Sequence, residues 1–111
     1  MTFAQLRAAI LSIIGRAPNP VCYDLATTEI NARLGLELDN LVADGDTNDI
    51  LKEFPGLYLY GALAQHAALI RDEKAATIYR ATLEAHYNQA RQGLASEAFQ
   101  PKPVVPPLAT P

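Results

Sequence analysis

Acidic and amide side chains alternate along one short stretch of the chain. Asp44, Asp46 and Asn48 occupy every second position, which is the spacing of the first three ligands in a calcium-binding loop. The rest of that pattern is missing, because Asp49 stands where the loop requires glycine and Pro55 stands where a bidentate glutamate completes the site. The sequence therefore favours a capped, solvated loop over a calcium site.

Histidine and cysteine are the other candidates for chemistry. His66 and His86 fall on two helices that should pair and could face each other, with Glu84 nearby in sequence. Helical metal sites place ligands three or four residues apart, and neither histidine has such a neighbour. We interpret both as hydrogen-bonded parts of a helix interface. Cys22 is the single cysteine, and we interpret it as a small buried apolar residue.

Catalytic loops are not evident in the sequence. The six glycines are scattered singly, so neither a phosphate-cradling loop nor a nucleophile elbow is formed. We therefore expect no catalytic residue, no metal and no cofactor. An enzyme that uses Cys22 or the histidines ranks last among the functions considered.

Size and charge narrow the class further. The chain has 111 residues, half of them apolar, which is enough for one compact core. Its formal net charge of −3 disfavours tight binding to nucleic acid. Charged residues interrupt every apolar segment before it reaches the roughly 20 residues that cross a bilayer, and the first residues do not resemble a secretory signal. We expect no membrane partner.

The elements that would position these side chains are all helices. Thr2 and Gln5 form a capping box that begins the first, and Gly35 is placed to end the second. Asp46 or Thr47 should cap a short turn before Pro55. The predicted helices span residues 3–16, 20–34, about 47–54, 57–70 and 72–97. The expected fold class is all-α: a small four-helix bundle whose last two helices form an antiparallel hairpin.

Helical spacing also predicts which faces are buried. The second helix should bury a stripe of Val21, Leu25, Ile30 and Leu34. Most of the tyrosines should pack in the core with their hydroxyls at its rim. The predicted inward face of the last helix consists of Ala75, Ile78, Tyr79, Thr82, Leu83, His86, Tyr87, Ala90 and Leu94.

Composition changes abruptly after the last helix. We divide the chain into a helical bundle, residues 1–97, and an extended Pro-rich C-terminal arm, residues 98–111. The arm carries apolar side chains but has no neighbours of its own to bury them, which suggests a partner groove or sheet edge. A disordered linker is the alternative. The predicted partner-binding residues are Phe99, Pro101, Pro103, Val104, Val105, Pro106, Pro107 and Leu108.

Two segments before the arm carry a family pattern. They read NDILKEFPGLYLYGAL at residues 48–63 and IRDEKA at residues 70–75. An acidic or Asn residue starts a short turn that ends in Pro; an aromatic-rich Leu-Tyr-Leu helix follows, and an Asp-Glu corner leads into a last long helix. In this the chain resembles the neck adaptor proteins of tailed bacteriophages, also called head-tail connector or head-completion proteins. Residues 47 to about 90 carry the likeness best.

The resemblance implies a structural protein of the virion neck, made in the host cytoplasm. It implies a helical homo-oligomer, commonly a dodecameric ring, that docks on the portal protein through the C-terminal arm. A tail-side neck or tail-terminator protein would bind below, and DNA would pass through the lumen without specific binding. Many relatives carry a longer insertion between the second and third helices, whereas this chain has only residues 36–46 there.

A second interpretation of the sequence is a function unrelated to a virion. The chain could be a helical protein-protein interaction module whose Pro-rich tail is bound by a partner with an aromatic groove. Pro103 to Pro106 satisfy the P-x-x-P pattern, although this match is short and frequent by chance.

Overall fold

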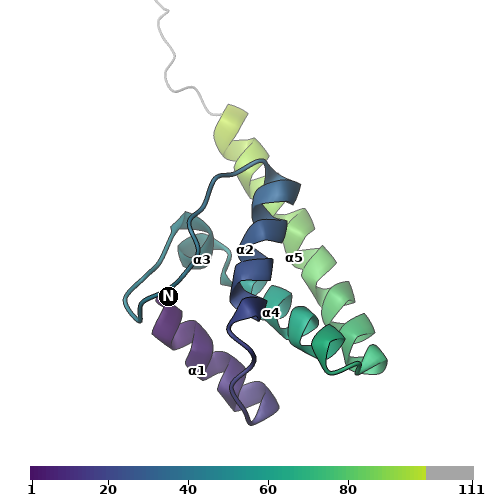
Figure 1. Cartoon of the computed structure of the whole chain (residues 1–111). Coiled ribbons are helices and arrows are strands. Elements are labelled where there is room, and N and C mark those ends of the chain that lie inside the picture. The colour runs from purple at the N-terminus through teal and green to yellow at the C-terminus, as the bar shows by residue number, and fades with distance from the viewer. Residues whose placement is uncertain (100–111) are drawn as a thin grey trace, which may run out of the picture.

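Five α-helices form the protein over the part of the chain that its computed structural model describes, which is the backbone of residues 1–99 and the side chains of residues 1–95. The predicted all-helical fold class is confirmed there, and these residues contain no strand. No helix among them combines the length and the apolar composition needed to span a membrane. Figure 1 shows the five helices: α1 Phe3–Ile14, α2 Val21–Leu34, α3 Asp49–Glu53, α4 Pro55–Leu69 and α5 Glu73–Phe99.

Helix α4 is the element on which the others pack. Each of α1, α2, α3 and α5 makes its main contacts with it. Its sequence is apolar on nearly every side, which is typical of a helix surrounded by neighbours. Small residues let those neighbours approach closely: a side chain at Gly61 would put its Cβ 3.3 Å from the Cβ of Ala26 on α2. The core is therefore built around one helix.

Some predicted helix ends are confirmed and others are corrected; α4, for example, begins at Pro55 and not at residue 57. The Thr2–Gln5 capping box is present, and Gly35 ends α2 with φ of 67°. However, α1 ends two residues earlier than predicted, because Gly15 adopts a left-handed φ of 74°. The cap of α3 is also different from the prediction, since Asn48, and neither Asp46 nor Thr47, accepts the hydrogen bond from the Leu51 N–H.

The antiparallel α4–α5 hairpin is confirmed. Arg71 turns the chain with φ of 60°, and the Asp72 carboxylate accepts a hydrogen bond from the Ala75 N–H at the start of α5. Helix α5 continues to Phe99, which the prediction assigned to the arm. The reason is that the first helix-breaking residue after this helix is Pro101, and proline restricts only the residue immediately before it. The other predicted partner-binding residues lie outside the described residues.

The predicted face of α2 is correct at Ile30 and Leu34, which are buried or packed against the core, and wrong at Val21 and Leu25. Val21 and Leu25 are 39% and 37% exposed, whereas Cys22, Tyr23, Ala26, Thr27 and Ile30 are buried. A polar residue lies on the buried face because its hydroxyl is satisfied there: Thr27 Oγ1 donates to the Tyr23 carbonyl and lies 2.9 Å from the hydroxyl of Tyr58. Because the prediction considered only apolar residues, it placed Val21 and Leu25 on the buried face of α2 and omitted Thr27.

On α5 the predicted face is largely correct. Leu83, Tyr87 and Ala90 are buried, and the other members are half-buried except Ile78, which is 56% exposed. At 100° per residue Ile78 lies roughly 140° around the helix from Leu83, so it faces away from α4. Of the tyrosines, Tyr58 is fully buried, and its hydroxyl bonds Thr27 and Asn48 inside the protein instead of reaching the rim.

Gly56 tests the packing of α4 against α5. A Cβ placed there would lie 2.4 Å from two ring atoms of His86, whose imidazole stacks on Tyr60. We expect Gly56→Ala to lower the free energy of unfolding by about 1–3 kcal/mol, although alanine favours helices, because the stacked ring must move. Chemical denaturation measures this.

The matched control is Gly45→Ala, since a Cβ at Gly45 has no neighbour within 4 Å. It should change stability by less than about 0.5 kcal/mol. A Gly56→Ala variant as stable as the wild type would contradict the close approach.

Candidate interaction surfaces

An open groove with a volume of about 620 Å³ lies between α1 and the beginning of α2. We call it the α1–α2 groove. It runs from the first residue of α1 to Leu11, past the turn that joins the two helices, and under part of the loop before α3. Its lining consists of Phe3, Ala4, Arg7, Ala8, Leu11, Ala17, Pro18, Pro20, Tyr23, Asp24, Leu41 and Val42.

Aromatic packing and backbone hydrogen bonds hold the groove in shape. The rings of Phe3 and Tyr23 meet edge to face with centroids 4.9 Å apart, which ties α1 to α2. The Phe3 and Ala4 N–H groups, which have no partner within the helix, donate to carbonyls of the loop before α3. Thr2 to Ala4 and this loop are therefore held together.

Apolar atoms dominate the exposed rim. Leu11 is 49% exposed and Val42 is 78% exposed. Arg7 and Asp24 are the charged residues of the lining. The Arg7 guanidinium lies over the Phe3 ring and pairs with Asp44, so its charge is partly matched. An apolar concave surface of this kind is typical of a site that binds another chain.

The loop of residues 36–48 positions one wall of the groove. Its two ends are fixed by side chains: Asn31 exchanges two hydrogen bonds of 2.8 and 3.0 Å with the backbone of Leu38, and the Asp46 carboxylate accepts the N–H groups of Val42 and Ala43. These two N–H bonds lower the pKa of Asp46. Val42 is thus presented on an anchored loop.

Sequence reasoning missed this wall of the groove because it treated the loop as a polar connection. Leu41 is only 5% exposed and anchors the loop in the core. The available signal was the recurrence of Leu36, Leu38 and Leu41 within an otherwise polar stretch.

The three calcium-type side chains do not converge. Asp44 pairs with Arg7, Asp46 binds loop N–H groups, and Asn48 caps α3. The interpretation as a capped loop is therefore confirmed. Among the residues of the described part, no group of three or more His, Cys, Asp or Glu side chains is arranged to hold a metal ion.

The two histidines do not face each other. His86 stacks on Tyr60 with centroids 5.1 Å apart and lies beside Gly56, at the beginning of α4. His66 is 8% exposed near the end of α4, where it lines a cavity of about 230 Å³ with Asp72 and other residues. The two histidines are apart because α4 and α5 are antiparallel: the end of α4, where His66 lies, packs near the beginning of α5, whereas His86 lies farther along α5 beside the beginning of α4.

Cys22 behaves as the sequence predicted. Its side chain is fully buried, and burial raises the pKa of the thiol, which keeps the thiol protonated and weakly nucleophilic.

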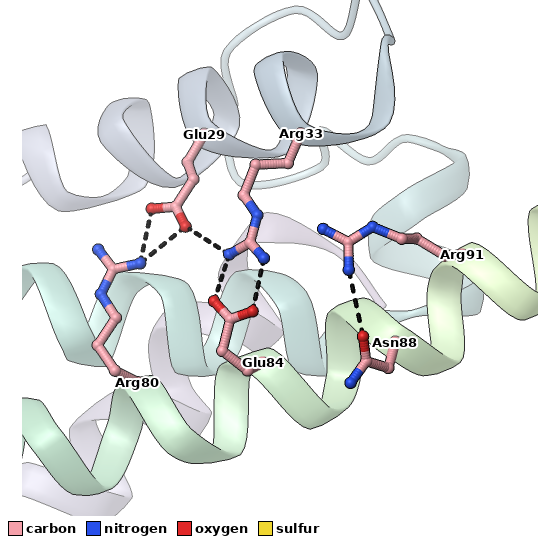
Figure 2. A network of polar contacts seen from close by, with 6 residues as sticks. All are labelled: Glu29, Arg33, Arg80, Glu84, Asn88 and Arg91. Atoms are coloured by element: carbon pink, nitrogen blue, oxygen red, sulfur yellow. Dashed lines mark hydrogen bonds and ion pairs between the residues drawn. The ribbon is translucent and has the colours of Figure 1, made fainter.

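A network of ion pairs joins α2 to α5 (Figure 2). Arg33 makes two contacts of 2.5 and 2.6 Å with the Glu84 carboxylate, and a longer one of 3.2 Å with Glu29. Arg80 in turn contacts both oxygens of Glu29, at 2.7 and 2.9 Å. The network therefore contains two guanidinium groups and two carboxylates, and its net charge is zero.

The same network covers a buried tyrosine. The Arg33 guanidinium lies 3.9 Å from the centroid of the Tyr87 ring. Its hydrogen bonds lower the pKa of Glu84, while burial raises the pKa of Tyr87. Both Glu84 and Tyr87 therefore keep their ordinary charge near neutral pH, and the network serves to hold α2 against α5. Sequence reasoning did not find it; only the Glu29–Arg33 spacing of four residues was visible.

A scan against protein-family models and searches of curated proteins and of solved structures found no match to this chain.

Removing Arg33 and Glu84 in a double-mutant cycle tests the α2–α5 network. We expect a coupling energy of about 0.5–1 kcal/mol for Arg33→Ala with Glu84→Ala, since both side chains are partly exposed and solvent screens them. The coupling should fall at high salt. The Arg7–Asp44 pair, with side chains 42% and 76% exposed, is the matched control and should couple less. Equal coupling in the two pairs would contradict the role given to the network.

Asp46 should make loop stability depend on pH. Its pKa is lower in the folded protein than in the unfolded chain, so its stabilising effect is present above about pH 4 and is lost as the pH falls further. We expect Asp46→Asn to be less stable than the wild type at neutral pH, with the difference shrinking in acid. Urea denaturation at several pH values measures this.

Asp39→Asn provides the control, because the Asp39 carboxylate accepts no hydrogen bond from the described residues. A difference between Asp46→Asn and the wild type that stays constant across the acid range would contradict the assignment.

Proposed function

We propose that this protein is a structural adaptor of a tailed-phage virion neck. In this proposal it forms a ring that docks on the portal, links head to tail and leaves a channel for DNA. The observation that carries the proposal is the neck-adaptor pattern of residues 48–63 and 70–75. Those residues build α3, α4 and the corner into α5, so the pattern coincides with the centre of the fold.

Two features of the helical body support a structural role. Its histidines, cysteine and calcium-type side chains are each occupied in packing or hydrogen bonds, as described above. Its surface also exposes large apolar side chains in several places, among them Leu11, Val42, Leu69 and Ile78. Such residues suit a body that is covered by other subunits. In the ring the helical body would form the wall, commonly in twelve copies.

The arm would fasten the ring to the portal. Val104, Val105 and Leu108 are apolar, Lys102 is the one charged side chain after Phe99, and the prolines limit the conformational entropy that binding would remove. The tail-side face would meet a neck or tail-terminator protein. The net charge of −3 suits a lumen along which DNA slides without specific binding, because fixed negative charge repels phosphate.

Substitutions in the arm test the proposed attachment. We expect Val104→Asp combined with Leu108→Asp to reduce copurification with the proposed portal partner by at least about tenfold, because charge would have to be buried. Lys102→Ala is the matched control in the same segment and should retain binding. Electron microscopy of the mixture should show rings on portals for the wild type and control only.

Retained portal binding by the double variant would rule out the arm as the anchor. A gene that lies away from capsid and tail genes would contradict the neck assignment as a whole.

A further inference from the structure

We infer that the α1–α2 groove of one copy binds the Pro-rich arm of a second copy. The segment that enters is residues 101–108, with Val104 and Val105 placed on the exposed apolar rim at Leu11 and Val42. This goes beyond the neck assignment, because it concerns how copies of this chain bind each other without any other protein.

The chemistry of groove and arm matches. Pro-rich segments are commonly bound in apolar grooves. Here Tyr23 and Pro18 form the buried floor of the groove, whereas Leu11, Pro20 and Val42 are its exposed apolar residues. The valines of the arm would cover the exposed rim of the groove, which removes apolar surface from water on both partners.

Charge agrees with the same pairing. Lys102 is the single charged side chain in residues 100–111. Asp24 lies in the groove lining and forms no ion pair with the described residues, whereas the other charged residue of the lining, Arg7, is paired with Asp44. The groove therefore presents one unmatched negative group to an arm that carries one positive group.

The geometry requires that the arm come from another copy. Glu29 pairs with Arg80 and Arg33 with Glu84, both 51 positions apart, so α2 and α5 run in the same direction. Glu29 is level with Arg80, and Phe99 lies a further 19 residues along α5, roughly 28 Å away. Asp24 precedes Glu29 on α2 and lies farther still from Phe99.

The number of residues after Phe99 shows whether the arm can occupy the groove of its own copy. Lys102 follows Phe99 by three residues, so its backbone reaches at most roughly 11 Å from that of Phe99 even when fully extended. Lys102 therefore cannot pair with Asp24 of its own groove. Figure 1 shows the same separation, with the end of α5 and the turn between α1 and α2 at opposite ends of the molecule.

A smaller cavity beside Leu94 is closer to the arm of the same copy. It is lined by Leu36, Leu38, Phe54 and other residues, but its volume of about 170 Å³ is about a quarter of that of the groove. We therefore assign the arm to the groove of a second copy.

Arm exchange of this kind joins two different surfaces of the same chain. Such contacts build rings when the rotation closes and open chains when it does not. An arm held in a neighbour's groove is not free to meet another protein, so binding to a further partner would compete with self-association.

Disulfide trapping between two differently substituted copies tests the inference. The full-length Val42→Cys protein is mixed with the full-length Val105→Cys protein, and the mixed dimer is identified by mass; natural Cys22 is buried and is present in every sample. We expect several-fold more mixed dimer than from Ile78→Cys with Val105→Cys, in which the exposed Ile78 lies outside the groove. Adding Leu11→Glu to the Val42→Cys copy should remove the excess.

Two results would overturn the inference. Equal yields from the Val42→Cys and Ile78→Cys partners would show that the groove does not select the arm. A dilute protein carrying both Val42→Cys and Val105→Cys that closes an internal disulfide would show that the arm binds within its own copy. Both measurements use this protein alone, so they succeed or fail independently of the portal.

Discussion

Packing on a single apolar helix is the constraint on which the rest of this structure depends. Helix α4 presents apolar or small side chains on nearly every side, and all the other helices make their main contacts with it. Close approach is possible where no side chain intervenes, as at Gly61 against α2 and at Gly56 against His86 of α5. Bulk added at these positions acts directly on the core, because packed interiors do not yield readily.

A consequence of this arrangement is that the outer helices have little close contact with one another. Between α2 and α5 the long side chains of Glu29, Arg33, Arg80 and Glu84 span the distance, and Arg33 also covers the buried Tyr87 ring. Between α1 and α2 no such network exists among the groove residues, and an open apolar groove is left. One boundary is thus closed by charge within the chain, while the other is left for a separate segment to fill.

These features are the basis of the proposal that the protein works by assembly. The side chains most capable of chemistry are occupied: Cys22 and His66 are buried, and Asp46 binds backbone N–H groups. What remains available is apolar surface on the body and an apolar, Pro-rich arm. The neck-adaptor proposal and the arm-exchange inference use the same arm for different acceptors, and the first concerns attachment to the portal whereas the second concerns contact between copies.

Local patterns determined most of the secondary structure, because caps and turns depend on residues close in sequence. The Thr2–Gln5 box, the Gly35 end and the Asp72 corner were all visible in the sequence. Which face of α2 is buried was decided only by tertiary structure, since Thr27 becomes a core residue once the Tyr58 hydroxyl lies against it. The sequence held only partial signals of the α1–α2 groove and of the α2–α5 ion network, and tertiary structure decided both. Both bring together side chains far apart in the chain, and their proximity depends on how helices pack around α4 and not on any local preference.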